Sequence, residues 1–147
     1  MHIYLGADHR GYQLKDELMN WLRAHQISFT DFGAMEYDAE DDFNDYAKKV
    51  AQAVVTNPGD DDFGILLCGS GQGMAMQANR FKGIRAAICL NPAEAMETRS
   101  HNDANILCLP ADSIPNNEVY DIINAFMNTK PLTEEKYQRR CRKLDED

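Results

Sequence analysis

Gly64-Ile-Leu-Leu-Cys-Gly-Ser-Gly-Gln-Gly-Met74 is an apolar run that ends in a thiol and passes at once into a loop of three glycines and a serine. An apolar run of this length, bounded by glycines, is typical of a buried strand. Glycine at alternate positions lets successive backbone N–H groups turn toward one point. We therefore predict a strand that leads into an anion cradle, with the Cys68 thiol at its edge as a candidate base or nucleophile.

The spacing of these residues excludes three well-known loops. A dinucleotide fingerprint would need its third glycine at Met74, and a P-loop would need lysine followed by serine or threonine after Gly73. A cysteine phosphatase would carry an arginine shortly after the thiol, and none occurs between Cys68 and Arg80. A cradle for a small anion, or for negative charge that develops in a reaction, remains. The alternative is a tight strand-to-helix turn in which Cys68 packs as a small apolar residue.

Composition limits the class of protein. The 147 residues are 44% apolar and 27% charged, which favours one soluble domain over residues 1–147. We expect a cytoplasmic protein without a membrane span, because no apolar stretch is long enough and no signal-peptide pattern begins the chain. A net charge of −9 argues against nucleic acid as a partner. Four irregularly spaced cysteines indicate neither a zinc site nor a disulfide framework, so we expect no metal and no cofactor.

Short apolar runs alternate with helical periodicity along the whole chain. The runs predict five strands: Ile3–Ala7, Ile27–Phe32, Phe63–Leu67, Ile84–Cys89 and Asn105–Leu109. Amphipathic helices are predicted between them and after Pro115, and a last basic helix is predicted with Thr133 as its cap. Strict alternation implies parallel pairing through right-handed crossovers, hence an α/β fold, a three-layer αβα sandwich with a Rossmann-like five-stranded sheet.

We predict the strand order 2-1-3-4-5, which places the topological switch point between strands one and three. Ligands bind there, outside the carboxyl ends of the strands, where the loops Asp8–Gly11 and Cys68–Gly71 would meet. A simpler interpretation has Asp8 capping the first helix and His9 exposed in its first turn. A third polar cluster, Ser100-His-Asn-Asp103, stands just before strand five, where an N-cap-like turn is the simple interpretation.

Four ordered motifs carry a resemblance that extends over most of the chain. The sequence resembles the ribose-5-phosphate isomerase B family, which includes galactose-6-phosphate and allose-6-phosphate isomerases. The motifs are Gly6-Ala-Asp-His-Arg-Gly11, Gly64-Ile-Leu-Leu-Cys-Gly-Ser-Gly-Gln-Gly73, Ala78-Asn-Arg-Phe-Lys-Gly-Ile-Arg-Ala86 and His101-Asn-Asp-Ala-Asn-Ile106. The resemblance implies metal-free interconversion of an aldose phosphate and a ketose phosphate through a cis-enediolate. Such a reaction needs a base for a carbon-bound proton and donors for the oxygen that becomes negative.

The resemblance assigns roles around the glycine loop. Cys68 matches the thiolate base, and a helix N-terminus with oriented N–H groups favours the thiolate form of such a cysteine. The backbone from Gly69 through Gly71 to Gly73 matches the oxyanion cradle. Ser70 matches a hydroxyl that passes a proton between substrate oxygens. One branch of the family has a glutamate base at the position of Met74. Methionine cannot accept a proton, so the chain resembles the cysteine-base branch.

Other residues match substrate contacts. His101 matches the acid that opens the furanose ring, and Asn102 matches a polar contact to the substrate or the enediolate. Asp8 and His9 match positions that orient sugar hydroxyls. The resemblance also implies that each site is built from two subunits, with the histidine supplied across a dimer interface. A homodimer or a dimer of dimers is therefore expected.

The phosphate side departs from the family pattern. Arg140 matches a phosphate-binding arginine of the C-terminal basic helix, but Lys136 stands where arginine is usual and Tyr137 where histidine is common. Asp112 replaces a frequent arginine and would repel phosphate if it pointed inward. Lysine keeps the charge but loses the bidentate fork.

The leading hypothesis is therefore an isomerase that interconverts ribose 5-phosphate and ribulose 5-phosphate. A hexose 6-phosphate isomerase for allose or galactose is an alternative, and so is a non-catalytic sugar-phosphate sensor. A redox-sensing protein that uses Cys68 is a further alternative, although no resolving cysteine lies near it in the sequence.

Overall fold

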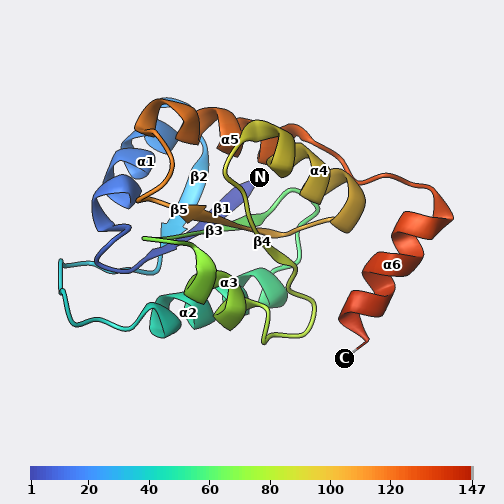
Figure 1. Cartoon of the computed structure of the whole chain (residues 1–147), viewed down its shortest axis with the longest axis horizontal. Helices are drawn as coiled ribbons and strands as arrows, with labels where there is room; N and C mark the ends of the chain where they lie inside the picture. The colour runs from blue at the N-terminus through green and yellow to red at the C-terminus, as the bar shows by residue number, and fades with distance from the viewer. Residues whose placement is uncertain (147) are drawn as a thin grey trace.

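Five parallel strands form one sheet in a computed structural model of the chain, which describes residues 1–146 (Figure 1). Helices cover both faces of this sheet, so the predicted α/β sandwich is confirmed. The strands are β1 (His2–Ala7), β2 (Ser28–Asp31), β3 (Phe63–Cys68), β4 (Ala86–Ile88) and β5 (Ile106–Pro110).

The predicted strand order is wrong at one edge of the sheet. The observed order is β2-β1-β3-β5-β4, so β5 and not β4 lies beside β3. All five residues of β5 are buried, whereas β4 has three half-buried residues. The more apolar strand therefore occupies the interior position and the shorter one forms the edge. The exchange leaves β1 and β3 as neighbours, so the switch point between them stands.

The helices divide into two layers. On one face α1 (Tyr12–Ala24), α4 (Pro92–Asn102) and α5 (Asn116–Asn128) enclose the larger apolar core. On the other face α2 (Phe43–Thr56) and α3 (Gln72–Ala78) enclose a second core. Residues of β3 alternate between these cores, and the side chain of Cys68 belongs to the second. The thiol therefore lies on the α2–α3 side of the sheet.

The basic helix α6 (Glu135–Asp145) projects from the sandwich and contacts α4 (Figure 1). The described part of this helix has no buried side chain, and its end is tied to the sandwich by Arg85, whose Nη1 donates to both oxygens of Asp145 at 2.9 and 2.8 Å. The predicted cap at Thr133 is wrong: Glu134 precedes the helix, and its side chain accepts no capping hydrogen bond. A helix with so little buried surface depends on contacts outside itself.

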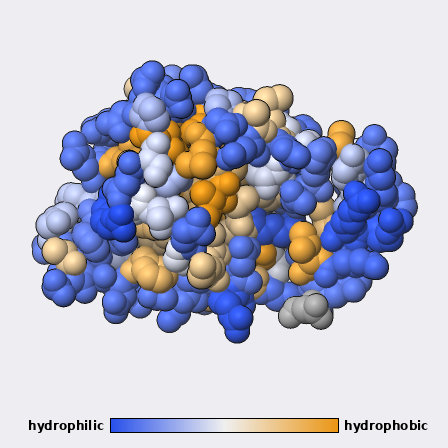
Figure 2. Space-filling model, viewed as in Figure 1, coloured by the Kyte–Doolittle hydropathy of each residue, from blue (hydrophilic) through white to orange (hydrophobic). Residues whose placement is uncertain are grey.

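Polar residues cover most of the face drawn in Figure 2, and apolar residues gather around β4 and β5 and beside α6. Large apolar side chains are exposed after β4, in α4 and in α6, namely Leu90, Met96 and Leu144. Among the helices of residues 1–146, none combines the length and the apolar character needed to cross a bilayer.

Candidate active site

The Cys68 thiol stands at the carboxyl end of β3, with 6% of the residue exposed. Its Sγ accepts a hydrogen bond from the backbone N–H of Gly71 at 3.0 Å. Gly71 has a φ of +74°, in the left-handed region that glycine tolerates best. This backbone conformation turns an N–H donor onto the sulfur, and such a donor stabilises negative charge there.

The glycine loop leaves Ser70 as its exposed residue. The Ser70 Oγ accepts a hydrogen bond from the N–H of Gln72 at 3.3 Å, where α3 begins. A Cβ atom at Gly73 would come within 2.7 Å of the Phe43 ring, so the loop is packed closely against the start of α2. The loop therefore presents the Ser70 hydroxyl on its exposed side while its other side is closed by protein.

Asp8 lies buried directly after β1. Its Oδ1 accepts hydrogen bonds from the N–H groups of Arg10 at 2.9 Å and Gly11 at 3.2 Å, so the carboxylate organises the turn before α1. The helix itself begins after Gly11 without a side-chain cap. Burial raises the pKa of Asp8 above its ordinary value, and the two N–H donors oppose that rise.

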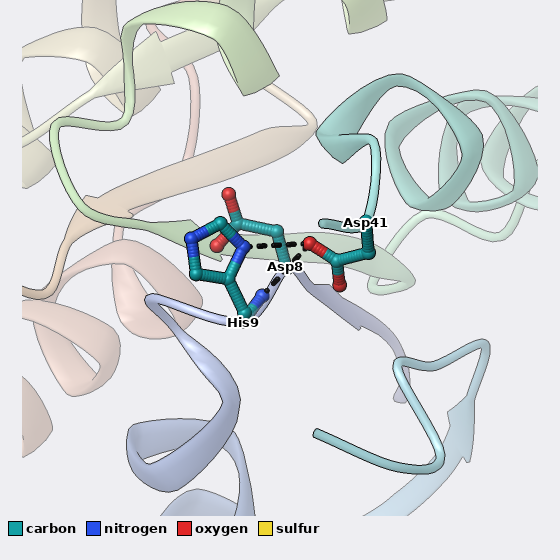
Figure 3. A group of neighbouring side chains, drawn as sticks. All are labelled: Asp8, His9 and Asp41. Atoms are coloured by element: carbon teal, nitrogen blue, oxygen red, sulfur yellow. Dashed lines mark hydrogen bonds and ion pairs between the residues drawn. The ribbon is translucent and has the colours of Figure 1, made fainter. Parts of the chain in front are cut away.

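His9 is paired with a residue that the sequence did not single out. Its Nδ1 lies 2.7 Å from Oδ1 of Asp41, and its backbone N–H donates to the same oxygen at 3.2 Å (Figure 3). The hydrogen bond to Asp41 raises the pKa of His9, with the negative charge of Asp8 acting in the same direction. The other ring nitrogen points away from Asp41, which leaves it open to a ligand.

Asp8, His9 and Asp41 place potential metal ligands within 4.8 Å of one another. One oxygen of each carboxylate is already engaged, because Asp41 Oδ1 faces the His9 ring and Asp8 Oδ1 accepts two backbone N–H groups. The cluster is therefore organised as a hydrogen-bonded acid and histidine pair. Asp41 belongs to the acidic run Asp38–Asp42. The sequence could have indicated it, because the loop after β2 begins at the same end of the sheet as the loop after β1.

Asp112 follows the carboxyl end of β5, and it is ion-paired with Arg10. The expectation that Asp112 would repel a phosphate is therefore altered by a neighbouring positive charge. Arg10 was visible in the sequence only as a member of the first motif. Its partner stands 102 residues away, so spacing along the chain carried no sign of the pair.

His101 and Asn102 form the last turn of α4, so the simple interpretation of this cluster as an N-cap-like turn is wrong. The chain reverses one residue later at Asp103, which has a φ of +47°. This end of α4 feeds the start of β5, whereas Cys68 pairs with Pro110 at the finish of β5. A five-residue strand spans about 16 Å, so His101 and Cys68 of one chain lie at opposite ends of the strands.

A second cluster forms where α4 meets α6. The His101 ring stacks on Tyr137, with centroids 5.0 Å apart and planes 12° apart, and its Nδ1 lies 3.7 Å from Glu97. Lys136 Nζ and Arg140 Cζ lie 5.0 and 5.8 Å from the centroid of the Tyr137 ring. We call this group the α4–α6 cluster: His101, Asn102, Lys136, Tyr137 and Arg140. The group at the carboxyl ends of the strands is called the loop cluster: Asp8, His9, Cys68 and Ser70.

The doubly wound α/β sheet places a buried thiol and a glycine loop beside an acid and histidine pair at its switch point. This arrangement suits a protein that transfers a proton next to developing negative charge. The chain belongs to the ribose/galactose isomerase family, whose model matches residues 3–144. The family predicted from the four sequence motifs is therefore confirmed.

Relatives of known name resemble the chain over most of its length. A probable ribose-5-phosphate isomerase B of Mycoplasma genitalium is 36% identical over 143 residues, which cover 97% of this chain and 93% of the relative. The structure of a ribose 5-phosphate isomerase of Thermotoga maritima matches with a TM-score of 0.92 and 43% identity, covering 99% of this chain and 98% of that one. A structure of the Mycoplasma genitalium enzyme with bound ribulose 5-phosphate matches with a TM-score of 0.91 and 36% identity, over 97% of this chain and 93% of that one.

Proposed function

We propose that the protein interconverts ribose 5-phosphate and ribulose 5-phosphate. The observation that carries this proposal is the Cys68 thiol, buried at the switch point and held by the N–H of Gly71. The relative from Mycoplasma genitalium supports the choice of sugar, because its structure holds ribulose 5-phosphate.

The chemistry is a proton transfer between two neighbouring carbons. The Cys68 thiolate removes the proton from C2 of the open-chain aldose, and negative charge moves onto the C1 oxygen. The N–H groups from Gly69 through Gly71 to Gly73 stabilise this enediolate. Ser70 passes the hydroxyl proton from the C2 oxygen to the C1 oxygen, and the thiol returns its proton to C1. One C–H bond breaks and another forms, so the sugar is rearranged without net oxidation.

The ends of the substrate require further groups. Asp8 and His9 orient the sugar hydroxyls, and the raised pKa of His9 favours its function as a hydrogen-bond donor. His101 protonates the ring oxygen to open the furanose, and Asn102 contacts the substrate or the enediolate. Lys136 and Arg140 in the C-terminal basic helix attract the phosphate.

We propose further that each active site is shared between two chains of a homodimer. The loop cluster lies at the carboxyl ends of the strands and the α4–α6 cluster at their amino ends, so a single chain does not bring them to one substrate. A second copy supplies the missing cluster in each site. The exposed apolar side chains Met96 and Leu144 fit this arrangement, because they belong to α4 and α6, the helices that carry the α4–α6 cluster.

Isomerisation by the purified protein tests the proposal. Ribose 5-phosphate and ribulose 5-phosphate are each supplied with a chelator present, and allose 6-phosphate and galactose 6-phosphate are assayed alongside. We expect chelator-resistant turnover of the pentose in both directions. Turnover of a hexose in preference would assign the alternative substrate, and binding of sugar phosphates without any turnover would assign a sensor.

A further inference from the structure

The guanidinium of Arg10 covers the glycine loop next to the thiol. A Cβ atom at Gly69 would collide with the Cζ and Nε atoms of Arg10, so the guanidinium fills the space that a side chain would take. Gly69 directly follows Cys68 in the loop. A permanent positive charge is therefore fixed one residue from the proposed base.

Asp112 holds the guanidinium in this place. Arg10 Nη2 donates to Asp112 Oδ2. Asp112 is itself tied to the loop, because its N–H donates to the Gly69 carbonyl at 3.1 Å and the N–H of Ala111 donates to the Cys68 carbonyl at 2.8 Å. The other end of Arg10 is fixed through its own N–H, which donates to Asp8. The side chain is thus positioned from both ends.

The guanidinium keeps donors available for a ligand. Arginine has five N–H donors in a rigid fork, and within residues 1–146 Asp112 is the one side chain that accepts a hydrogen bond from this guanidinium. The Arg10 side chain is 51% exposed, so part of the guanidinium remains accessible to a ligand. The hydrogen bond to Asp112 and the charges of Asp112, Asp8 and Cys68 raise the pKa of Arg10, which keeps it charged.

We propose that Arg10 binds the phosphate group of the substrate and that Asp112 positions it to do so. The proposal rests on the isomerase function proposed above. A pentose 5-phosphate carries its reacting carbons at one end and its phosphate at the other, so a substrate with C2 at Cys68 extends beyond the thiol along the loop. A guanidinium with one edge held by a carboxylate offers its other edge to phosphate oxygens in a bidentate contact.

The pair could instead serve only as a clamp between the turn after β1 and the segment after β5. A clamp predicts a loss of thermal stability with unchanged affinity for phosphate. A group that acts on the enediolate predicts a fall in kcat with unchanged affinity for phosphate. A phosphate-binding residue predicts a rise in KM together with an equal rise in the inhibition constant of inorganic phosphate.

The test compares Arg10→Met with the wild-type enzyme. We expect KM for ribose 5-phosphate and the inhibition constant of inorganic phosphate to rise together by about 10- to 100-fold, since one charge-assisted contact is lost, while kcat changes by less than about threefold. Asp112→Asn, which keeps Arg10 but weakens its anchor, raises both constants by about three- to tenfold. Lys130→Met is the matched control, because it also removes an exposed ion pair, with Asp61, and leaves both constants unchanged.

Several results would overturn the assignment. Unchanged inhibition by inorganic phosphate in Arg10→Met does so, whether kcat or thermal stability falls. Arg10→Lys serves if the methionine variant fails to fold, and it must show a smaller rise of the same two constants. A wild-type protein that turns over no sugar phosphate contradicts the isomerase and leaves the Arg10 assignment testable, because calorimetry with inorganic phosphate still compares Arg10→Met with the wild type.

Discussion

In the loop cluster, at the carboxyl ends of the strands, backbone groups fix the functional side chains, whereas in the α4–α6 cluster the side chains are fixed by one another. Cys68 and Asp8 are buried and accept hydrogen bonds from the main chain of their own loops. His101 is stacked on Tyr137 of a helix that buries no side chain. The first region is preorganised within one chain, and the second rests on a helix that buries no side chain of its own. The difference supports a site in which one chain supplies the base and another supplies the acid.

The largest expected effect comes from removing the base. Cys68→Ala should lower kcat by about 10²- to 10⁴-fold, while ribose 5-phosphate still binds, because a general base acts on the transition state. Steady-state kinetics and calorimetry measure the two quantities. Cys89→Ala is the control: burial raises the pKa of Cys89 to about 12, so that thiol stays protonated and its loss should leave kcat unchanged. An active Cys68→Ala variant would remove the thiol from the mechanism.

A smaller effect should follow from disturbing the turn after β1. A Cβ atom at Gly11 would lie 2.6 Å from the backbone carbonyl carbon of Leu67. Backbone cannot move aside as a flexible side chain does, so Gly11→Ala should lower the free energy of unfolding by about 1–3 kcal/mol. It should also lower kcat/KM, because the turn carries Asp8 and His9.

Gly83→Ala sharpens this comparison. Gly83 has a φ of +83° and no atom within 4 Å of an added Cβ, so the substitution brings backbone strain without a clash. It should lower the melting temperature and leave kcat/KM unchanged. A Gly11→Ala variant with wild-type stability and activity would show that the loop cluster is not tightly preorganised.

The smallest effect concerns the pair of His9 and Asp41. The hydrogen bond to Asp41 raises the pKa of His9 above its ordinary value, so an NMR titration of the imidazole should have a raised midpoint, and Asp41→Asn should lower it. A histidine pKa raised by folding adds stability below the unfolded pKa, and this stability is lost as pH rises through the folded pKa. Unfolding followed against pH should show that loss in the wild type and less of it in Asp41→Asn. Identical titrations of the two proteins would contradict the pairing.

Local sequence patterns predicted the strands and the glycine loop because each depends on neighbouring residues. Strand order depends on which strands pair, and both β4 and β5 are apolar runs, so periodicity could not rank them. Arg10 and Asp41 were missed for a related reason: each acquires its role from a partner distant in sequence. A turn was the simple interpretation of the polar cluster at His101, because its residues are typical of turns, although α4 continues through Asn102.

Complementation between two inactive variants tests the shared site most directly. Cys68→Ala and His101→Asn are each expected to be nearly inactive, and the two proteins are unfolded, mixed in equal amounts and refolded together. In a mixed dimer, one of the two sites has both an intact loop cluster and an intact α4–α6 cluster. Half of the dimers are mixed, so the mixture should recover about a quarter of the wild-type kcat. A mixture no more active than its two components would show that Cys68 and His101 do not act from different chains at one site.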